Sequence, residues 1–337
     1  MVIEVLRKLV CWKVRRFAPE VKDPNRPKKS PLFSRLPIFH SSLLPFASSR
    51  YPSLVADIPF PHTALVLLGH GSTWHAGAAA PVFRHAETLR RRGAFAEVRE
   101  ALWKQEPQIQ AVLASLTQPR AVVCPLMMSD GYFSGERIPQ ILGFLPPDAA
   151  GRRPPLKVEG REVFYAQPVG THPAMTSVIL ERARRVVADH PFPRAPKPRD
   201  ITLCLAGHGT AESAASRLAV EHQVELLRAL ELYGAVEAVF LEEAPLVAEC
   251  RQLARTRNVV VVPFFASDAS HVLEDIPLQL GLPEPVLRQR LAAGQPPWRN
   301  PTESRGALVW CSASVGTDPS LAEVILDRAR EALAPEP

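Results

Sequence analysis

The sequence predicts an α/β fold of two tandem doubly wound parallel-sheet domains that arose by internal duplication. One observation is that TALVLLGHGST (63–73) matches ITLCLAGHGTA (201–211) without gaps at an offset of 138 residues. The same offset relates PLMMSDGYFSGERIPQILG (125–143) to PFFASDASHVLEDIPLQLG (263–281). Apolar strand-like runs also alternate with helical patterns, which is typical of βαβ units with right-handed crossovers. A match this long indicates a repeated domain.

The first half reads strand, loop, helix, strand, helix, strand, loop, helix, strand, helix. Short apolar runs bounded by turn residues predict its strands, and longer amphipathic segments predict its helices. We expect strands at 64–68, about 96–103, 120–126 and 162–167, and helices near 80–92, 107–117, 137–143 and 173–188.

The second half repeats this order, with strands expected at 201–205, 236–241, 258–264 and 307–311. Near the ends of the halves, VGTHPAMTSVILERAR (169–184) matches VGTDPSLAEVILDRAR (315–330) at an offset of 146. Eight extra residues therefore lie in a Pro-rich loop between Gly281 and Gly306. We expect domains at 61–189 and 201–337, joined by the linker HPFPRAPKPRD (190–200).

Residues 1–60 differ in composition from the rest of the chain. Residues 1–50 hold 11 Lys/Arg and 3 Asp/Glu, a net charge of +8, so the remainder of a chain with net charge +6 sums to −2. The folded part therefore gives no reason to expect a nucleic-acid partner. A targeting peptide or membrane-surface anchor is one interpretation of the leader. A poorly ordered basic extension, or an artefact of start-site assignment, is the favoured one.

Composition also bears on the compartment. No apolar run approaches the roughly 18 to 20 residues that a membrane span needs. The five cysteines form no CxxC or other metal-ligand spacing, and three lie inside strand-like runs, where Cys usually acts as a small hydrophobe. We therefore expect a reducing, cytoplasmic location.

Two histidines are expected to share one crevice. His208 follows the strand-like run ITLCLAG, and His271 lies in the loop after VVVVP. The carboxyl ends of neighbouring parallel strands meet at the edge where open α/β sheets bind ligands. Neutral imidazoles bind first-row divalent metals and accept protons near neutral pH. One site can thus present a metal to a nitrogen macrocycle and receive the departing pyrrole protons. No electron moves, so no cofactor beyond the metal is expected.

The GHGS/GHGT pair together with PFFxSDxxHVxxDIP resembles the class II tetrapyrrole chelatases, the sirohydrochlorin cobalt- and ferrochelatases of the CbiX/SirB type. The resemblance covers about 63–330, and the HVxxDIP segment is its specific part. It implies two chelatase-like domains that insert Co²⁺ or Fe²⁺ into sirohydrochlorin, on the route to cobalamin or sirohaem. By motif match, it also implies that His208 and His271 are the metal-binding and catalytic pair, with His70 as their counterpart in the first half.

The first half departs from this pattern. Phe133 occupies the position of His271, so the second imidazole is missing. His75 and His85 are either substitutes or plain surface residues. We expect an active C-terminal half and a first half that forms the other wall of the cleft, where His70, Tyr132 and Phe133 contact the macrocycle.

Several further residues are candidates. Glu243, with its neighbour Glu242, follows the second strand of the second half and is a candidate metal ligand or proton carrier; a solvated helix start is the alternative. Ser267 is a candidate substrate contact, although Ser267 and Asp268 are more readily explained as loop-shaping residues. Because the substrate implied by the resemblance carries eight carboxylates, a basic rim is expected, with candidates Arg137, Arg152, Arg153, Arg217, Arg288 and Arg299. Trp298 and Phe133 are candidate aromatic contacts.

Two other function classes, a non-catalytic carrier and a histidine phosphotransfer enzyme, share parts of this pattern. A metal or tetrapyrrole carrier would keep the fold without turnover, but the intact His208 and His271 argue against complete loss of activity. A histidine phosphotransfer enzyme would place an arginine before the motif histidine, where this chain has Gly69 and Gly207. The metal is not identified, because affinities at imidazole sites follow the Irving–Williams order. The duplication supplies two domains in one chain, so a monomer is sufficient.

Overall fold

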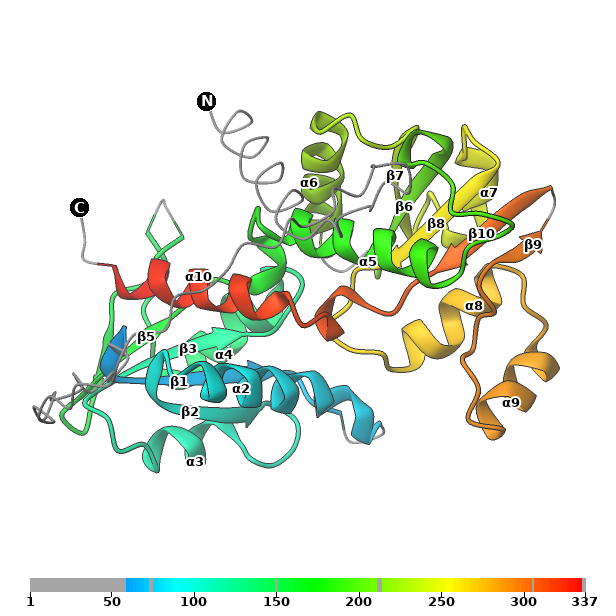
Figure 1. Ribbon diagram of the computed structural model, residues 1–337. Coiled ribbons are helices and arrows are strands. Elements are labelled where there is room, and N and C mark those ends of the chain that lie inside the picture. Colours follow the sequence, from blue (N-terminus) through cyan, green and yellow to red (C-terminus); the bar gives the residue numbers. More distant parts are fainter. Residues whose placement is uncertain (1–58, 73–74, 149–150, 211–213, 305, 335–337) are drawn as a thin grey trace, which may run out of the picture. The chain divides into compact units, whose positions relative to one another are not determined.

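Two five-stranded sheets, one from each half of the chain, form the framework of the computed structural model (Figure 1). The structure describes residues 59–72, 75–148, 151–210, 214–304 and 306–334. The predicted basic extension over 1–60 lies, except for its last two residues, outside this range. The first sheet contains β1 (Phe60–Gly69), β2 (Phe95–Leu102), β3 (Arg120–Pro125), β4 (Leu156–Val158) and β5 (Arg161–Tyr165). The second contains β6 (Ile201–Gly207), β7 (Ala235–Phe240), β8 (Asn258–Pro263), β9 (Thr302–Ser304) and β10 (Ala307–Cys311).

The strand order is β2-β1-β3-β5-β4 in the first sheet and β7-β6-β8-β10-β9 in the second. Four strands of each sheet run parallel, and the edge strands β4 and β9 pair antiparallel with β5 and β10. The duplicated, doubly wound α/β fold is therefore confirmed. The two edge strands were not predicted, because three residues are too few to show a strand pattern.

Nine α-helices complete the described part of the two halves. The first half contributes α2 (Ala80–Arg92), α3 (Ile109–Ala114), α4 (Ile138–Leu142) and α5 (Met175–Asp189). The second contributes α6 (Ala215–Ala229), α7 (Cys250–Leu253), α8 (Ile276–Gln279), α9 (Glu284–Ala292) and α10 (Leu321–Leu333). No helix in the described ranges is long and apolar enough to cross a bilayer.

The loop predicted between Gly281 and Gly306 contains a helix. Prolines suggested irregular chain, but Pro283 is the N-cap of α9 and Pro285 lies in its first turn. Proline is tolerated there, since the first amides of a helix have no partner within it. The eight-residue insertion therefore adds α9 rather than a structureless loop.

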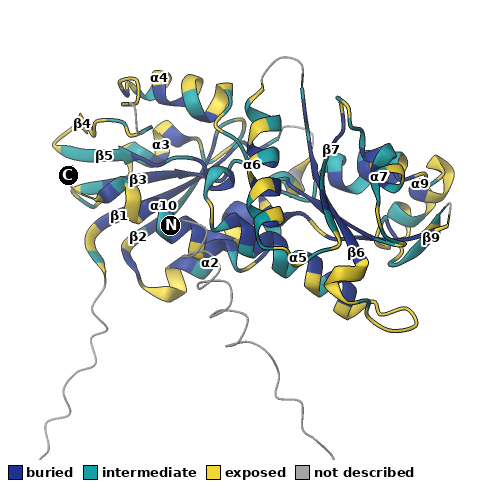
Figure 2. Ribbon diagram, turned by 90° about the horizontal axis from the view of Figure 1, so that it is seen from above, coloured by how far each residue is buried: buried dark blue, intermediate teal, exposed yellow. Residues whose placement is uncertain are grey.

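The last helix of each half covers the sheet of the other half. Helix α10 packs on β3 and β5, and α5 packs on β8 and β10. Residues from both sheets and both helices consequently form one continuous apolar cluster, with Ile179 and Ile325 fully buried in it. Figure 2 shows β3 and β6 largely buried, whereas α2 and α5 are exposed on their outer turns. The boundaries predicted at 61–189 and 201–337 follow the sequence repeat, but the core crosses them.

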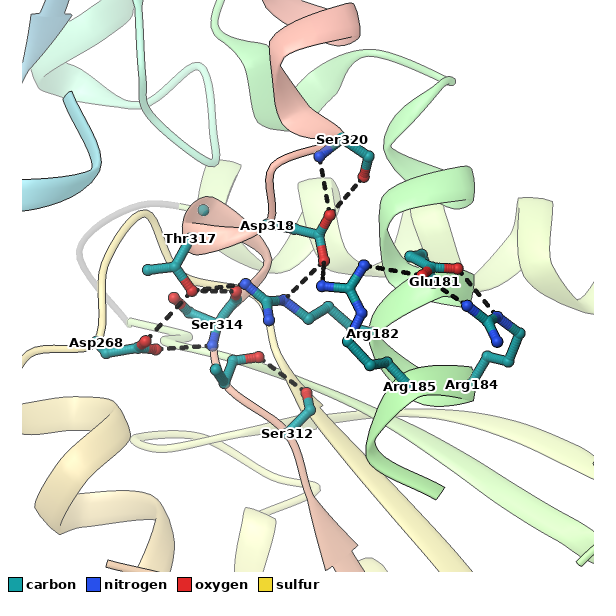
Figure 3. A network of polar contacts seen from close by, with 12 residues as sticks. Glu181, Arg182, Arg184, Arg185, Asp268, Ser312, Ser314, Thr317, Asp318 and Ser320 are labelled. Carbon is teal, nitrogen blue, oxygen red and sulfur yellow. Dashed lines mark hydrogen bonds and ion pairs between the residues drawn. The ribbon is translucent and has the colours of Figure 1, made fainter. Parts of the chain in front are cut away.

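A buried polar network fastens α5 to the start of α10 (Figure 3). The Asp318 side chain is fully buried, with Arg182 Nε 3.2 Å and Arg185 Nη1 3.4 Å from its Oδ2. The backbone amide of Ser320 donates to Asp318 Oδ1 at 2.9 Å. Asp268, in the loop after β8, accepts from the amide of Ser314 at 2.7 Å. This last contact agrees with the loop-shaping role expected for Asp268.

The sequence repeat places a different set of charged side chains at the equivalent contact in the first half, between α10 and the start of α5. At the offset of 146, Arg328 corresponds to Arg182, His172 to Asp318, and Glu331 to Arg185. Arg328 Nη2 donates to Thr171 Oγ1 at 2.7 Å, and Arg328 Nη1 lies 2.7 Å from Glu331. His172 Nε2 lies 3.1 Å from Glu331 Oε1. The position of the acid Asp318 is thus taken by the base His172, and that of the base Arg185 by the acid Glu331. The arginine at the third position is the same in both halves.

Candidate active site

Each GHG motif begins where a central strand ends. His70 follows β1 and His208 follows β6 directly. A Cβ added to Gly207 would lie 2.4 Å from Val220 Cγ2, so only glycine lets β6 end this close to α6. Gly209 has φ of 62°, in the left-handed region that glycine enters without strain. The two glycines therefore set the turn that projects the imidazole of His208.

His208 and His271 lie side by side, as the sequence predicted. Their ring centroids are 4.8 Å apart and the rings meet edge to face at 78°. His208 Nδ1 is 3.0 Å from the carbonyl oxygen of Gly209. Because a carbonyl only accepts, Nδ1 carries the proton and Nε2 keeps its lone pair. About a third of the His208 side chain is exposed.

His271 is held by a carboxylate on the next turn of its own helix. It opens the π-helical turn His271–Asp275 that leads into α8. Its Nδ1 lies 2.7 Å from Asp275 Oδ2. Asp275 thereby fixes the tautomer with a lone pair on Nε2, an arrangement typical of metal-binding histidines. From the sequence, Asp275 is expected only to favour the helix start through its dipole, although its i,i+4 spacing from His271 also allows this contact.

The two candidate glutamates take different partners. Glu242 Oε1 lies 3.5 Å from His208 Nε2. Glu243 Oε2 instead pairs with Arg217 at 3.1 Å, and its Oε1 is buried without a partner in the described part of the chain. The role predicted for Glu243 stays a prediction, and of the two glutamates it is Glu242 that lies beside His208. Among the described residues, no three His, Cys, Asp or Glu side chains form a metal site on their own.

One cavity of about 230 Å³ is lined by residues of both halves. His70, His208 and His271 all line it, so the three predicted imidazoles face a common space. The remaining lining residues are mainly apolar, which suits the face of a flat, conjugated ligand. They are Leu126, Met127, Met128, Ser129, Ser216, Val220, Phe264, Phe265 and Ala266.

In the first half, an aromatic ring replaces the second imidazole. The rings of His70 and Phe133 meet at 4.9 Å and 75°, nearly the geometry of the His208–His271 pair. Lys104 Nζ lies 5.6 Å from the centre of the Phe133 ring. Burial, and after it the charge of Lys104, lowers the pKa of His70. His70 Nδ1 also faces the carbonyl of Gly71 at 3.1 Å, so His70 is a neutral imidazole with a free Nε2.

The other predicted contacts lie farther from the cavity. Tyr132 is 55% exposed and touches Phe133 at its edge, with ring centroids 5.4 Å apart. Ser267 is half-buried in the loop after β8 and does not line the cavity. Trp298 is 5% exposed and donates to the carbonyl of Val309. The suggestion that Trp298 packs on a macrocycle was wrong, because this side chain belongs to the core of the second half.

His85 does not replace the missing imidazole. It is 3% exposed in α2, and its Nε2 donates to the carbonyl of Gly316 at 2.8 Å. At the offset of 138 its counterpart is Gln223, which is fully buried and donates to the carbonyl of His172 at 3.0 Å. Both side chains therefore fasten the first described helix of one half to the other half, at the VGT turn or at the residue directly after it. His75 is exposed and does not line the cavity.

Comparison with known proteins places this geometry in a family. A CbiX family model matches residues 64–186 and, a second time, residues 202–332. The chain belongs to the CbiX family. This CbiX chain is 37% identical over 282 residues to a probable sirohydrochlorin cobaltochelatase of Halobacterium salinarum, a match that covers 81% of the chain and 92% of the relative. The family indicated by the two motifs is therefore confirmed.

Solved structures resemble the CbiX chain as well. A multi-domain Deinococcus radiodurans protein with structural similarity to chelatases matches with a TM-score of 0.65 and 28% identity. The match covers 80% of this chain and 55% of that protein, so the chain spans about half its length. SirB of Bacillus subtilis with Fe³⁺ matches with a TM-score of 0.57 and 17% identity, over 81% of this chain and 96% of SirB. At that identity the likeness shows the fold alone.

Proposed function

We propose that this CbiX chain inserts a divalent metal, Co²⁺ or Fe²⁺, into sirohydrochlorin. The observation that carries the proposal is the His208–His271 pair, with rings 4.8 Å apart and both Nδ1 atoms already engaged. Two Nε2 lone pairs are thus available at one cavity. The Halobacterium salinarum relative, named for cobalt insertion into sirohydrochlorin, supports the same substrate.

The two imidazoles would act in sequence as ligands and as bases. Their Nε2 atoms bind the metal ion and leave its other coordination positions to the four macrocycle nitrogens. As the metal passes to the macrocycle, two pyrrole N–H protons must leave. The lone pairs released by the metal accept these protons, one on each ring. No electron is transferred, so the reaction needs no cofactor beyond the metal substrate.

A carboxylate lies beside each ring. Asp275 lies 2.7 Å from Nδ1 of His271, and Glu242 lies 3.5 Å from Nε2 of His208. Glu242 would carry a proton from His208 to solvent, because its side chain is 55% exposed.

Anaerobic insertion of Co²⁺ and Fe²⁺ into sirohydrochlorin tests the proposal. We compare the parent with His208→Ala, His271→Ala and His70→Ala. Activity that collapses in the first two variants alone identifies the second half as the catalytic one. Equal loss in His70→Ala extends the site to both halves. A parent that binds sirohydrochlorin and inserts neither metal contradicts the enzyme, and the same fold then serves as a tetrapyrrole or metal carrier.

A further inference from the structure

The first half repeats the site of the second half with its charges inverted. At the offset of 138, His70 keeps the place of His208, and Phe133 replaces His271. Lys104 stands where the second half has Glu242, and Arg137 stands where it has Asp275. Both carboxylates that flank the imidazole pair have thus become cations.

The backbone around these substitutions is the same in both halves. The amide of Lys104 donates to the carbonyl of His70 at 2.9 Å, and the amide of Glu242 donates to that of His208 at 3.2 Å. The turns Tyr132–Arg137 and His271–Asp275 are both π-helical and both lead into short helices that carry proline at the start. The inverted charges therefore stand on equivalent frames.

Neither cation is neutralised within the described part of the chain. Lys104 is exposed, lies 5.6 Å from the centre of the Phe133 ring, and forms no ion pair there. Arg137 follows Phe133 by one helical turn and is also exposed, and the structure describes no ion pair for it. By contrast, Arg217 and Arg288 of the predicted rim are paired with acids of their own half. Glu136, which precedes Arg137 in the chain, has its counterpart in Glu274 of the other half at the offset of 138.

We propose that Lys104, which lies over the Phe133 ring, and Arg137, at the end of the π-helical turn that carries Phe133, form a subsite that binds a peripheral carboxylate of the tetrapyrrole substrate. The inference rests on the proposed function and assigns the first half a share in it. A cation at Lys104 and the absence of an imidazole at Phe133 make a second metal ion unfavourable there. The same cations attract the carboxylates at the macrocycle edge, and the apolar Phe133 ring meets its face. The metal is thereby directed to the His208–His271 pair, and the carboxylate to the cations beside Phe133, whose ring contacts His70 at the edge of the cavity lining.

Binding of metal-free sirohydrochlorin tests the subsite without requiring turnover. We measure the dissociation constant by tetrapyrrole fluorescence for the parent, Lys104→Gln, Arg137→Gln and the double variant, at several salt concentrations. Uroporphyrin, which also carries eight carboxylates, serves as a second probe. The matched control is Lys157→Gln/Arg194→Gln, since both of these residues are exposed cations outside the loops and turns that carry His70, Phe133, His208 and His271.

Each single variant is expected to weaken binding roughly threefold to tenfold, as for an ion pair that becomes partly desolvated. The double variant should also show a flatter salt dependence, because fewer charges are screened. Co²⁺ affinity in the absence of tetrapyrrole should stay at the parent value, and Lys104→Arg should restore binding.

Failure of the subsite and failure of the proposed function give different experimental results. If the parent binds and metallates sirohydrochlorin while the double variant keeps its dissociation constant and salt slope, the subsite is wrong and the chelatase proposal stands. If the control double variant weakens binding equally, general charge explains the effect and the subsite is again wrong. If the parent binds neither tetrapyrrole, both proposals are contradicted.

Discussion

Asp275 determines which nitrogen of His271 keeps its lone pair. Its carboxylate holds Nδ1 at 2.7 Å, so the lone pair that the proposed function assigns to the metal is on Nε2. We predict that Asp275→Asn lowers Co²⁺ affinity roughly 10- to 100-fold, the usual effect of losing a carboxylate that orients a ligand histidine. Titration calorimetry with Co²⁺ measures this change. Glu274→Gln removes the adjacent exposed carboxylate and should leave the affinity unchanged; an equal loss in both variants would indicate a general charge effect.

His85 is a buried base whose neutral form is required by the fold. Burial is the main cause that lowers its pKa from the ordinary 6.5. The unfolded chain therefore binds a proton at this residue more readily, so the stabilisation is complete above pH about 6.5 and is lost as the pH falls below it. Gln223, its counterpart, makes the same type of hydrogen bond without titrating.

We predict that His85→Gln preserves the hydrogen bond to Gly316 and flattens the pH dependence of stability below pH about 6.5. At pH 8 the free energy of unfolding should change by less than about 1 kcal/mol, because one neutral hydrogen bond replaces another. Urea unfolding at several pH values tests this. His222→Gln, on the exposed face of α6, should keep the parent slope. A parent-like slope in His85→Gln would contradict the assignment.

At the scale of elements, the site of the second half can be rebuilt on the frame of the first. The triple variant Lys104→Glu/Phe133→His/Arg137→Asp gives His70 the same neighbours that His208 has. Since the turn Tyr132–Arg137 is already π-helical, no change of backbone is needed. We predict that Co²⁺ stoichiometry rises from one to two per chain, measured by equilibrium dialysis. A stoichiometry that stays at one would show that the two frames differ in ways that matter for the metal.

The sequence predicted the central strands well, because their apolar runs are long and end at turn residues. β6 was expected at 201–205 and extends to Gly207, and β8 was expected at 258–264 and ends at Pro263. The sequence did not predict the short edge strands β4 and β9 or the helix α9. Three residues carry no periodicity, and the prolines of α9 stand where a helix start tolerates them.

Within the site, the repeat located the imidazoles but not every carboxylate. His208 and His271 follow from strand ends that must neighbour each other in the sheet. Glu242 and Glu243 are adjacent in one loop, and only the fold decides that one faces His208 and the other Arg217. The charge inversion at Lys104 and Arg137 was readable at the offset of 138. Its relation to the site became apparent only from the structure, in which equivalent backbone hydrogen bonds and π-helical turns surround both sites.

At the scale of the whole molecule, Asp318 ties the two halves together. Its buried carboxylate faces Arg182 and Arg185 of the first half. We predict that Asp318→Asn lowers the free energy of unfolding by about 3 kcal/mol, because it leaves a buried positive charge without its counterion. Denaturant unfolding, followed by circular dichroism and tryptophan fluorescence, measures the loss.

Glu323→Gln is the matched control, since it makes the same acid-to-amide change in α10. Glu323 pairs with Arg92 of the first half at 2.7 Å, but 49% of its side chain is exposed. Its removal should cost less than about 1 kcal/mol. Because the halves share one apolar cluster, both probes should report a single transition in every variant. Separate transitions for the two probes would mean that the halves unfold independently.

Because helices α5 and α10 each pack on the sheet of the other half, they limit where the chain can be cut into fragments that fold. Cutting within 190–200 would separate each sheet from the helix that covers it, since α5 lies on β8 and β10 while α10 lies on β3 and β5. Each fragment alone would expose a broad apolar face to water. The two fragments together would hold every surface needed to bury that face again. Severed halves should therefore recover their structure only by recombining, and a half-length ancestor would have had to lend its last helix to a second copy of itself.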